Sequence, residues 1–155
     1  MKTNKKLIVQ VNKWLLARSK ESLKIAKKEI LNEKRESTKI NDAFKYYANS
    51  WNDVVHPGLL SIACEAVGGK ADDTTTIQVA TLLLTAGFDV HDDIIDESET
   101  KHGKPTIYAK YGKDITLLVG DAFLIKALIL LRKLEKQIPS DKMDAVWNII
   151  DSLFF

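Results

Sequence analysis

Cysteine, proline and glycine are scarce in this chain. Cys64 is the only cysteine among the 155 residues, so the chain can form no internal disulfide and no thiolate metal cluster. This cysteine usage is typical of a reducing compartment, and we expect a cytoplasmic protein. The three prolines and seven glycines fall between periodic segments, which leaves those segments free to form helices.

The chain also lacks an excess of charge of either sign and an uninterrupted apolar run. Its formal net charge is +2, which gives no reason to expect nucleic acid as a partner. The longest apolar stretch, residues 115–131, contains Asp121 and Lys126. Each charge would cost about 2.5–3.5 kcal/mol at the centre of a bilayer, so this stretch predicts a core helix and not a membrane span.

Helical periodicity runs along most of the sequence, and we expect a single all-helical domain over residues 1–155. A long N-terminal helix is expected at 3–35, and an aspartate-bearing helix at about 73–97. Further helices are expected at 40–52, 56–68, 114–136 and from 140 onward, with a loop at 101–106. The last helix stops on Leu153–Phe155 without a closing signal, which indicates a truncated pattern.

The most unusual segment is VHDDIIDESETKHGK, residues 90–104. On a helix, Asp92 and Asp96 lie one turn apart with Cβ atoms roughly 5–6 Å from each other, and Asp93 lies to one side. Like charges at this spacing are unfavourable, so a compensating cation is expected. Aspartates that simply cap and solvate the end of a helix are the alternative interpretation.

Mg²⁺ would provide this compensation, because it is usually held by one or two carboxylates together with waters and phosphate oxygens. The following loop supplies Lys101, His102 and Lys104, which could meet the remaining charge of a diphosphate. The segment therefore predicts a metal-bridged diphosphate site.

The region around this segment resembles the trans-isoprenyl diphosphate synthases, the polyprenyl synthetase family. The likeness runs from about residue 50 to residue 127 and rests on spaced motifs. These are HPGLLSIACEAVGG, the D-D-x-x-D of residues 92–96 after an apolar helix, a basic-Gly-x-Pro-Thr stretch, a Tyr-Gly pair, and Gly120-Asp121 before an apolar helix.

The resemblance implies an antiparallel helix bundle of the isoprenoid synthase type, truncated relative to the full family fold. It implies a prenyltransferase that binds an allylic diphosphate through Mg²⁺ and condenses it with isopentenyl diphosphate in isoprenoid biosynthesis. Carried over to this sequence, Asp92 and Asp96 would be metal ligands and Asp93 a supporting acid, the three forming the catalytic set. Phe88 would limit product length, or would be an ordinary core residue.

The sequence departs from the family pattern at several positions. His56 stands where an arginine is usual, and Lys101-His102 replaces an arginine pair. We therefore expect these residues and Lys104 to bind a diphosphate more weakly than arginines would. The second aspartate-rich motif is absent. The chain would then need a C-terminal half or a partner subunit, and a homo- or hetero-oligomer is expected. A non-catalytic partner subunit and an unrelated helical metal-binding protein are the alternatives.

Overall fold

The computed structural model describes residues 5–33 and 35–154. The helices are α1 (Lys5–Leu31), α2 (Thr38–Ser50), α3 (Val55–Ala66), the 3₁₀ turn η1 (Ala71–Thr74), α4 (Thr75–Ile95), α5 (Ile107–Tyr111), α6 (Lys113–Leu134) and α7 (Ser140–Phe154). Strands β1 (Thr100–Lys101) and β2 (Lys104–Pro105) form the one small sheet of these residues. The all-α fold is confirmed. Residues 3, 4 and 34 of the expected first helix, and the side chains of 153–155, lie outside the described part.

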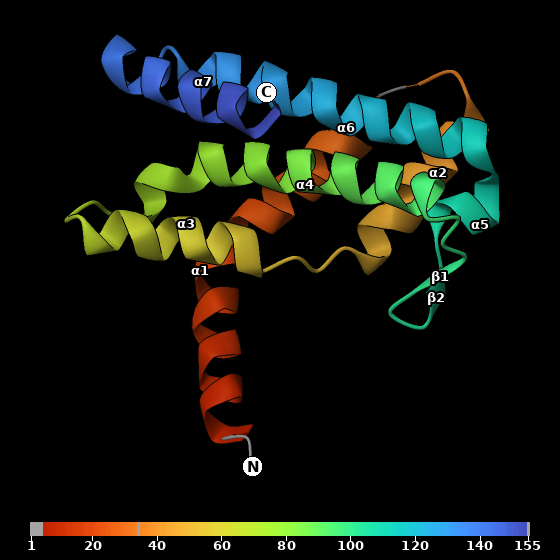
Figure 1. Ribbon diagram of the computed structural model, residues 1–155, viewed down its shortest axis with the longest axis horizontal. Coiled ribbons are helices and arrows are strands. Elements are labelled where there is room, and N and C mark those ends of the chain that lie inside the picture. The colour runs from red at the N-terminus through yellow and green to blue at the C-terminus, as the bar shows by residue number, and fades with distance from the viewer. Residues whose placement is uncertain (1–4, 34, 155) are drawn as a thin grey trace.

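Helix α4 lies at the centre of the molecule, between α3 and α6 (Figure 1). Its most extensive packing is against α6, and α1 crosses beneath α3 and α4. The first half of α1 extends away from the body, and the side chains of residues 5–14 are all exposed (Figure 1). Within the described residues, no helix is both long and apolar enough to cross a membrane.

Small residues allow α4 and α6 to approach closely. A Cβ atom on Gly120 would lie 2.5 Å from Nε2 of His91, so only glycine leaves room for this imidazole ring. His91 Nε2 also lies 3.2 Å from Oδ1 of Asp121, although the two atoms are not aligned for a hydrogen bond. The Gly120-Asp121 pair of the sequence therefore positions α6 against the aspartate-bearing end of α4.

Aromatic side chains join α2 to α6 in the core. Phe44 and Phe123 are almost fully buried and meet edge to face, with ring centroids 5.2 Å apart. Tyr47 and Trp51 pack on the other side of Phe123, with centroids 5.0 and 6.0 Å from its ring. Burial of one such ring stabilises the fold by about 1.5–3 kcal/mol, so this cluster holds the C-terminal end of α2 against α6.

The loop expected at residues 101–106 forms a β-hairpin instead. Lys101 pairs with Lys104, and the turn between them consists of His102 and Gly103. Both turn residues have positive φ angles, 52° and 74°, which is characteristic of the two-residue type I′ turn. The usual signal for this turn is Asn-Gly or Asp-Gly, which His102-Gly103 does not supply, so the sequence predicts only a loop at this position.

Candidate functional site

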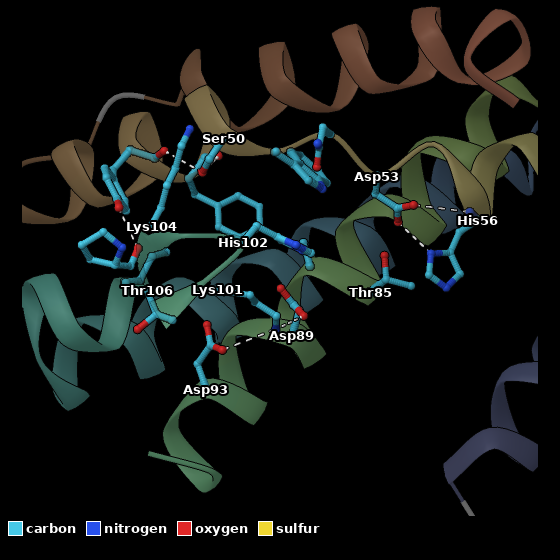
Figure 2. A pocket seen from close by; sticks show the side chains of 17 residues that line it. Ser50, Asp53, His56, Thr85, Asp89, Asp93, Lys101, His102, Lys104 and Thr106 are labelled. Carbon is cyan, nitrogen blue, oxygen red and sulfur yellow. Dashed lines mark hydrogen bonds and ion pairs between the residues drawn. The ribbon is translucent and has the colours of Figure 1, made fainter. Parts of the chain in front are cut away.

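One cavity of about 470 Å³ gathers most of the charged residues singled out in the sequence. It lies between the C-terminal end of α2, the segment leading into α3, the middle of α4 and the β-hairpin (Figure 2). Three carboxylates, two lysines, two histidines and an aromatic wall line it: Asp53, Asp89, Asp93, Lys101, Lys104, His56, His102, Tyr46, Tyr47 and Trp51.

Lys101 reaches from the hairpin to two aspartates of α4. Its Nζ atom donates to Oδ1 of Asp89 and lies 3.4 Å from Oδ1 of Asp93 (Figure 2). Asp89 and Asp93 are four residues apart and so project from the same face of the helix. The Asp93 side chain is only 8% exposed, whereas Lys101 and Asp89 are about two-fifths exposed, at 37% and 42%. One ammonium group is thus shared by two carboxylates at the wall of the cavity.

The surroundings of Asp93 and Lys101 shift the pKa values of both side chains. Burial raises the pKa of Asp93, and the charges of Asp89 and Asp92 add to this effect, while Lys101 opposes it. Burial alone would lower the pKa of Lys101, but its bonds and attraction to Asp89 and Asp93 outweigh burial and raise this pKa. Lys101 therefore stays charged, and Asp93 is the residue whose charged form is destabilised by burial.

Asp53 and His56 form a second pair across the cavity. Oδ2 of Asp53 lies 2.7 Å from Nδ1 of His56, and Oδ1 of Asp53 accepts the backbone N–H groups of Val55 and His56 at 3.0 and 3.4 Å (Figure 2). These backbone bonds satisfy free donors in the first turn of α3. Asp53 is therefore fixed in place, and it turns the imidazole of His56 toward itself.

Tyr47 lies in the aromatic wall of this cavity, close enough to feel the charges of its aspartates. Burial raises the pKa of its phenol far above the usual value, and the negative charges of Asp89, Asp53 and Asp93 raise it further. The phenol remains a neutral hydrogen-bond donor at every physiological pH. The potential at the aromatic wall is therefore negative.

The hairpin carries the cations at the rim of the cavity and is itself anchored. The Tyr46 hydroxyl donates to the carbonyl of Pro105 at 2.6 Å, and the Thr106 hydroxyl donates to the carbonyl of Ser98 at 2.6 Å. Lys104 lies opposite Lys101 in the hairpin and is exposed, as is His102. Like charges on opposite strand positions repel, and Asp89 offsets that repulsion only on the Lys101 side.

Asp92, Asp96 and Phe88 lie outside this cavity. Asp92 and Asp96 are exposed at the C-terminal end of α4, and their carboxylates make no ion pair or hydrogen bond with the rest of the described chain. Phe88 is 42% exposed and lies one turn before Asp92. Asp93, expected to lie to one side of the aspartate stripe, is the aspartate turned toward the interior.

The donor set at Asp92 and Asp96 fits Mg²⁺. Across residues 5–33 and 35–154, no three His, Cys, Asp or Glu side chains gather into a group that could hold a metal. Mg²⁺ does not need such a group, because one or two carboxylates suffice when waters and phosphate oxygens complete the octahedron. Two unpaired carboxylates one helical turn apart meet this requirement.

The structure brings Lys101, His102, Lys104, His56 and Asp93 together, as listed for the cavity above. Sequence reasoning missed Asp53 and Tyr47 as members of the site. Asp53 could have been noticed as a capping residue, because a short acidic side chain just before a helix accepts its free backbone N–H groups. Tyr47 gave no signal apart from helical spacing typical of core aromatics.

Comparisons with known proteins agree with this fold. A geranylgeranyl pyrophosphate synthetase from Pyrococcus horikoshii superposes with a TM-score of 0.74 and 31% identity, over 89% of this chain and 42% of that chain. A geranyltransferase from Legionella pneumophila gives 0.73 at 23% identity, over 88% of this chain and 49% of that one, which shows the fold alone. The helices thus define an isoprenyl diphosphate synthase fold.

The sequence comparisons are consistent with this class. The family model for polyprenyl synthetase matches residues 37–153, and the chain belongs to this family. The large subunit 1 of a heterodimeric geranylgeranyl pyrophosphate synthase from Arabidopsis thaliana is 34% identical over 58% of this chain and 25% of its own length. A geranylgeranyl diphosphate synthase from Sulfolobus acidocaldarius is 29% identical over 72% of this chain and 34% of its own length. The chain thus spans between a quarter and about a third of these relatives.

Proposed function

We propose that this chain binds an allylic diphosphate through Mg²⁺ held by Asp92 and Asp96, for condensation with isopentenyl diphosphate in isoprenoid biosynthesis. Family membership supports the reaction class, a prenyl transfer. The observation that carries the proposal for this chain is the pair of exposed carboxylates at the end of α4, which have no ion-pair or hydrogen-bond partner among residues 5–33 and 35–154. Because the relatives are much longer, the proposal includes a further polypeptide segment or partner subunit that completes the site.

Each candidate residue has a distinct part in this proposal. Bound Mg²⁺ would supply positive charge that stabilises a departing diphosphate. Asp92 and Asp96 hold and orient the metal, and the buried Asp93 supports them from the cavity side. Lys104 and His102 of the hairpin would meet the charge of the diphosphate, and Lys101 and His56 of the same cavity would assist them. Phe88, one turn before Asp92, would border the hydrocarbon chain and limit its length.

A non-catalytic partner subunit is the second candidate function, and one observation favours it. Lys101 and His56, which would bind a diphosphate, are already paired with Asp89 and Asp53 of the same chain. One relative is described as the large subunit of a heterodimeric synthase, a property of that protein. In this alternative the chain assembles with an active subunit, and we propose an oligomer in the cytoplasm for either function.

Calorimetry with dimethylallyl diphosphate tests the first proposal. The purified chain should bind it in the presence of Mg²⁺ and lose this binding when EDTA replaces the metal. Asp92→Asn should weaken the Mg²⁺-dependent binding at least about tenfold, since one charged ligand contact is worth on the order of 1.5–3 kcal/mol. The matched control is Asp144→Asn, an exposed aspartate on α7. Equal binding with and without Mg²⁺, or by wild type and Asp92→Asn, would exclude the proposed metal site.

A further inference from the structure

The cavity beside α4 contains its own counter-ions. Lys101 is bound to Asp89 and Asp93, and His56 is bound to Asp53. With both histidines neutral, the three carboxylates and two lysines of the lining give a net charge of −1. Lys101 and His56 are therefore not available to an incoming anion without breaking an existing pair.

An anion that enters this cavity meets an unfavourable potential. To use Lys101 it must displace Asp89, which leaves Asp89 and the buried Asp93 uncompensated. To use His56 it must displace Asp53, whose other oxygen is held by the backbone of α3. Only Lys104 and His102 remain, and both are exposed on the rim.

We propose that Asp53 and Asp89 are specificity-determining residues that close this cavity to a metal-free diphosphate by masking His56 and Lys101. The cavity then accepts a neutral group or a diphosphate whose charge a divalent cation has already reduced. The inference rests on the proposed function, in which an allylic diphosphate reaches this chain together with Mg²⁺. It assigns to Asp53 and Asp89 a role in selecting between the charge states of a ligand.

Neutralising either aspartate tests this inference by a gain of binding. Inorganic pyrophosphate is titrated calorimetrically in EDTA at low ionic strength into wild type, Asp89→Asn, Asp53→Asn and the double variant. Asparagine keeps the shape and an acceptor oxygen but removes the charge. Each single variant should bind pyrophosphate about tenfold more tightly than wild type, because one unit of repulsion at short range is removed. The double variant should gain about 100-fold, if the two separate sites act additively.

Two controls separate the electrostatic role from a structural one. Asp89→Glu keeps the charge and should bind pyrophosphate as weakly as wild type, and Asp144→Asn removes an equal charge from α7, outside the cavity. The gain should also shrink several-fold in 0.5 M NaCl, since salt screens charges that solvent reaches. A change of packing alone would give neither pattern.

The outcomes distinguish this inference from the proposed function. If Asp89→Asn and Asp53→Asn bind metal-free pyrophosphate no more tightly than wild type, the inference is wrong, even when wild type binds dimethylallyl diphosphate with Mg²⁺. If wild type shows no Mg²⁺-dependent binding but the variants gain affinity in EDTA, the proposed function fails and the masking of the cavity stands. Should Asp89→Asn not fold by circular dichroism, Asp53→Asn, which lies on a different element, decides the question.

Discussion

Helix α4 carries two pairs of aspartates at the same four-residue spacing, and the two pairs have opposite surroundings. Asp89 and Asp93 line the cavity and share the ammonium group of Lys101. Asp92 and Asp96 are exposed, and within the described chain no cation approaches their carboxylates. The spacing alone therefore does not determine which pair is open to a ligand.

The difference arises from the hairpin and not from the helix. Its type I′ turn places Lys101 toward the cavity side of α4, where the ammonium fills the position between two carboxylates that a divalent cation would otherwise take. No described residue does this for Asp92 and Asp96. One pair thus makes an internal contact, and the carboxylate oxygens of the other pair are exposed and make no ion pair or hydrogen bond with the described residues.

The largest expected effect comes from removing each pair in turn. Asp92→Asn with Asp96→Asn should weaken the binding of dimethylallyl diphosphate in Mg²⁺ at least about 100-fold, since two charged contacts are lost. Asp89→Asn with Asp93→Asn should weaken it far less, because neither carboxylate is a proposed ligand of the metal and Asp93 only supports the two that are. Titration calorimetry at a fixed Mg²⁺ concentration measures both double variants. Equal losses in the two variants would show that the pairs are equivalent and that the comparison is wrong.

Removing the shared ammonium should have the next largest effect. Lys101→Met leaves two carboxylates facing each other, so the free energy of unfolding should fall by about 1 kcal/mol. This is well below the cost for a fully buried pair, because Lys101 and Asp89 are 37% and 42% exposed and solvent screens them. Urea unfolding measures the change. Lys24→Met is the control, because the pair of Lys24 with Glu21 is fully on the surface, at 74% and 67% exposure.

The stability that the contacts of Lys101 contribute depends on pH. The pKa of Lys101 is raised in the folded state, since its contacts with Asp89 and Asp93 outweigh burial. Its contribution to stability is therefore complete below the unfolded value of about 10.4 and is lost as the pH rises through the raised pKa. The difference in stability between wild type and Lys101→Met should accordingly be constant near neutral pH and shrink above about pH 10.4. A difference that disappears near pH 7 would contradict this assignment.

Most of the helical fold could be predicted from the sequence, because glycine and proline separate segments of clear helical period. The helix expected at about 73–97 runs from Thr75 to Ile95, and the one expected at 114–136 runs from Lys113 to Leu134. The hairpin could not be predicted, because its strands are only two residues long and His102 occupies a turn position that asparagine usually takes. Local sequence patterns therefore predict long helices well, but they do not predict strands of only two residues.

The candidate site was less predictable than the fold. Helical geometry placed Asp92 and Asp96 together, and the basic composition of residues 101–104 indicated cations nearby. The sequence could not show that Lys101 is bound to Asp89, because that contact depends on the hairpin. It also could not show that Asp53 is bound to His56 at the start of α3. Charge that is neutralised across separate elements is a tertiary property, and a linear pattern does not contain it.

The smallest expected effect follows from the unpaired carboxylates themselves. Asp92 repels Asp96 across one helical turn and lies in the last turn of α4, near the negative end of the helix dipole. Without Mg²⁺, Asp92→Asn should therefore raise the free energy of unfolding by roughly 0.3–1 kcal/mol at low ionic strength, and 0.5 M NaCl should remove most of the gain. Asp144→Asn near the start of α7 should give no gain, because an acid there faces the positive end of its helix. A loss of stability in Asp92→Asn would reveal a favourable contact at this carboxylate, which would remove the contrast between the two aspartate pairs.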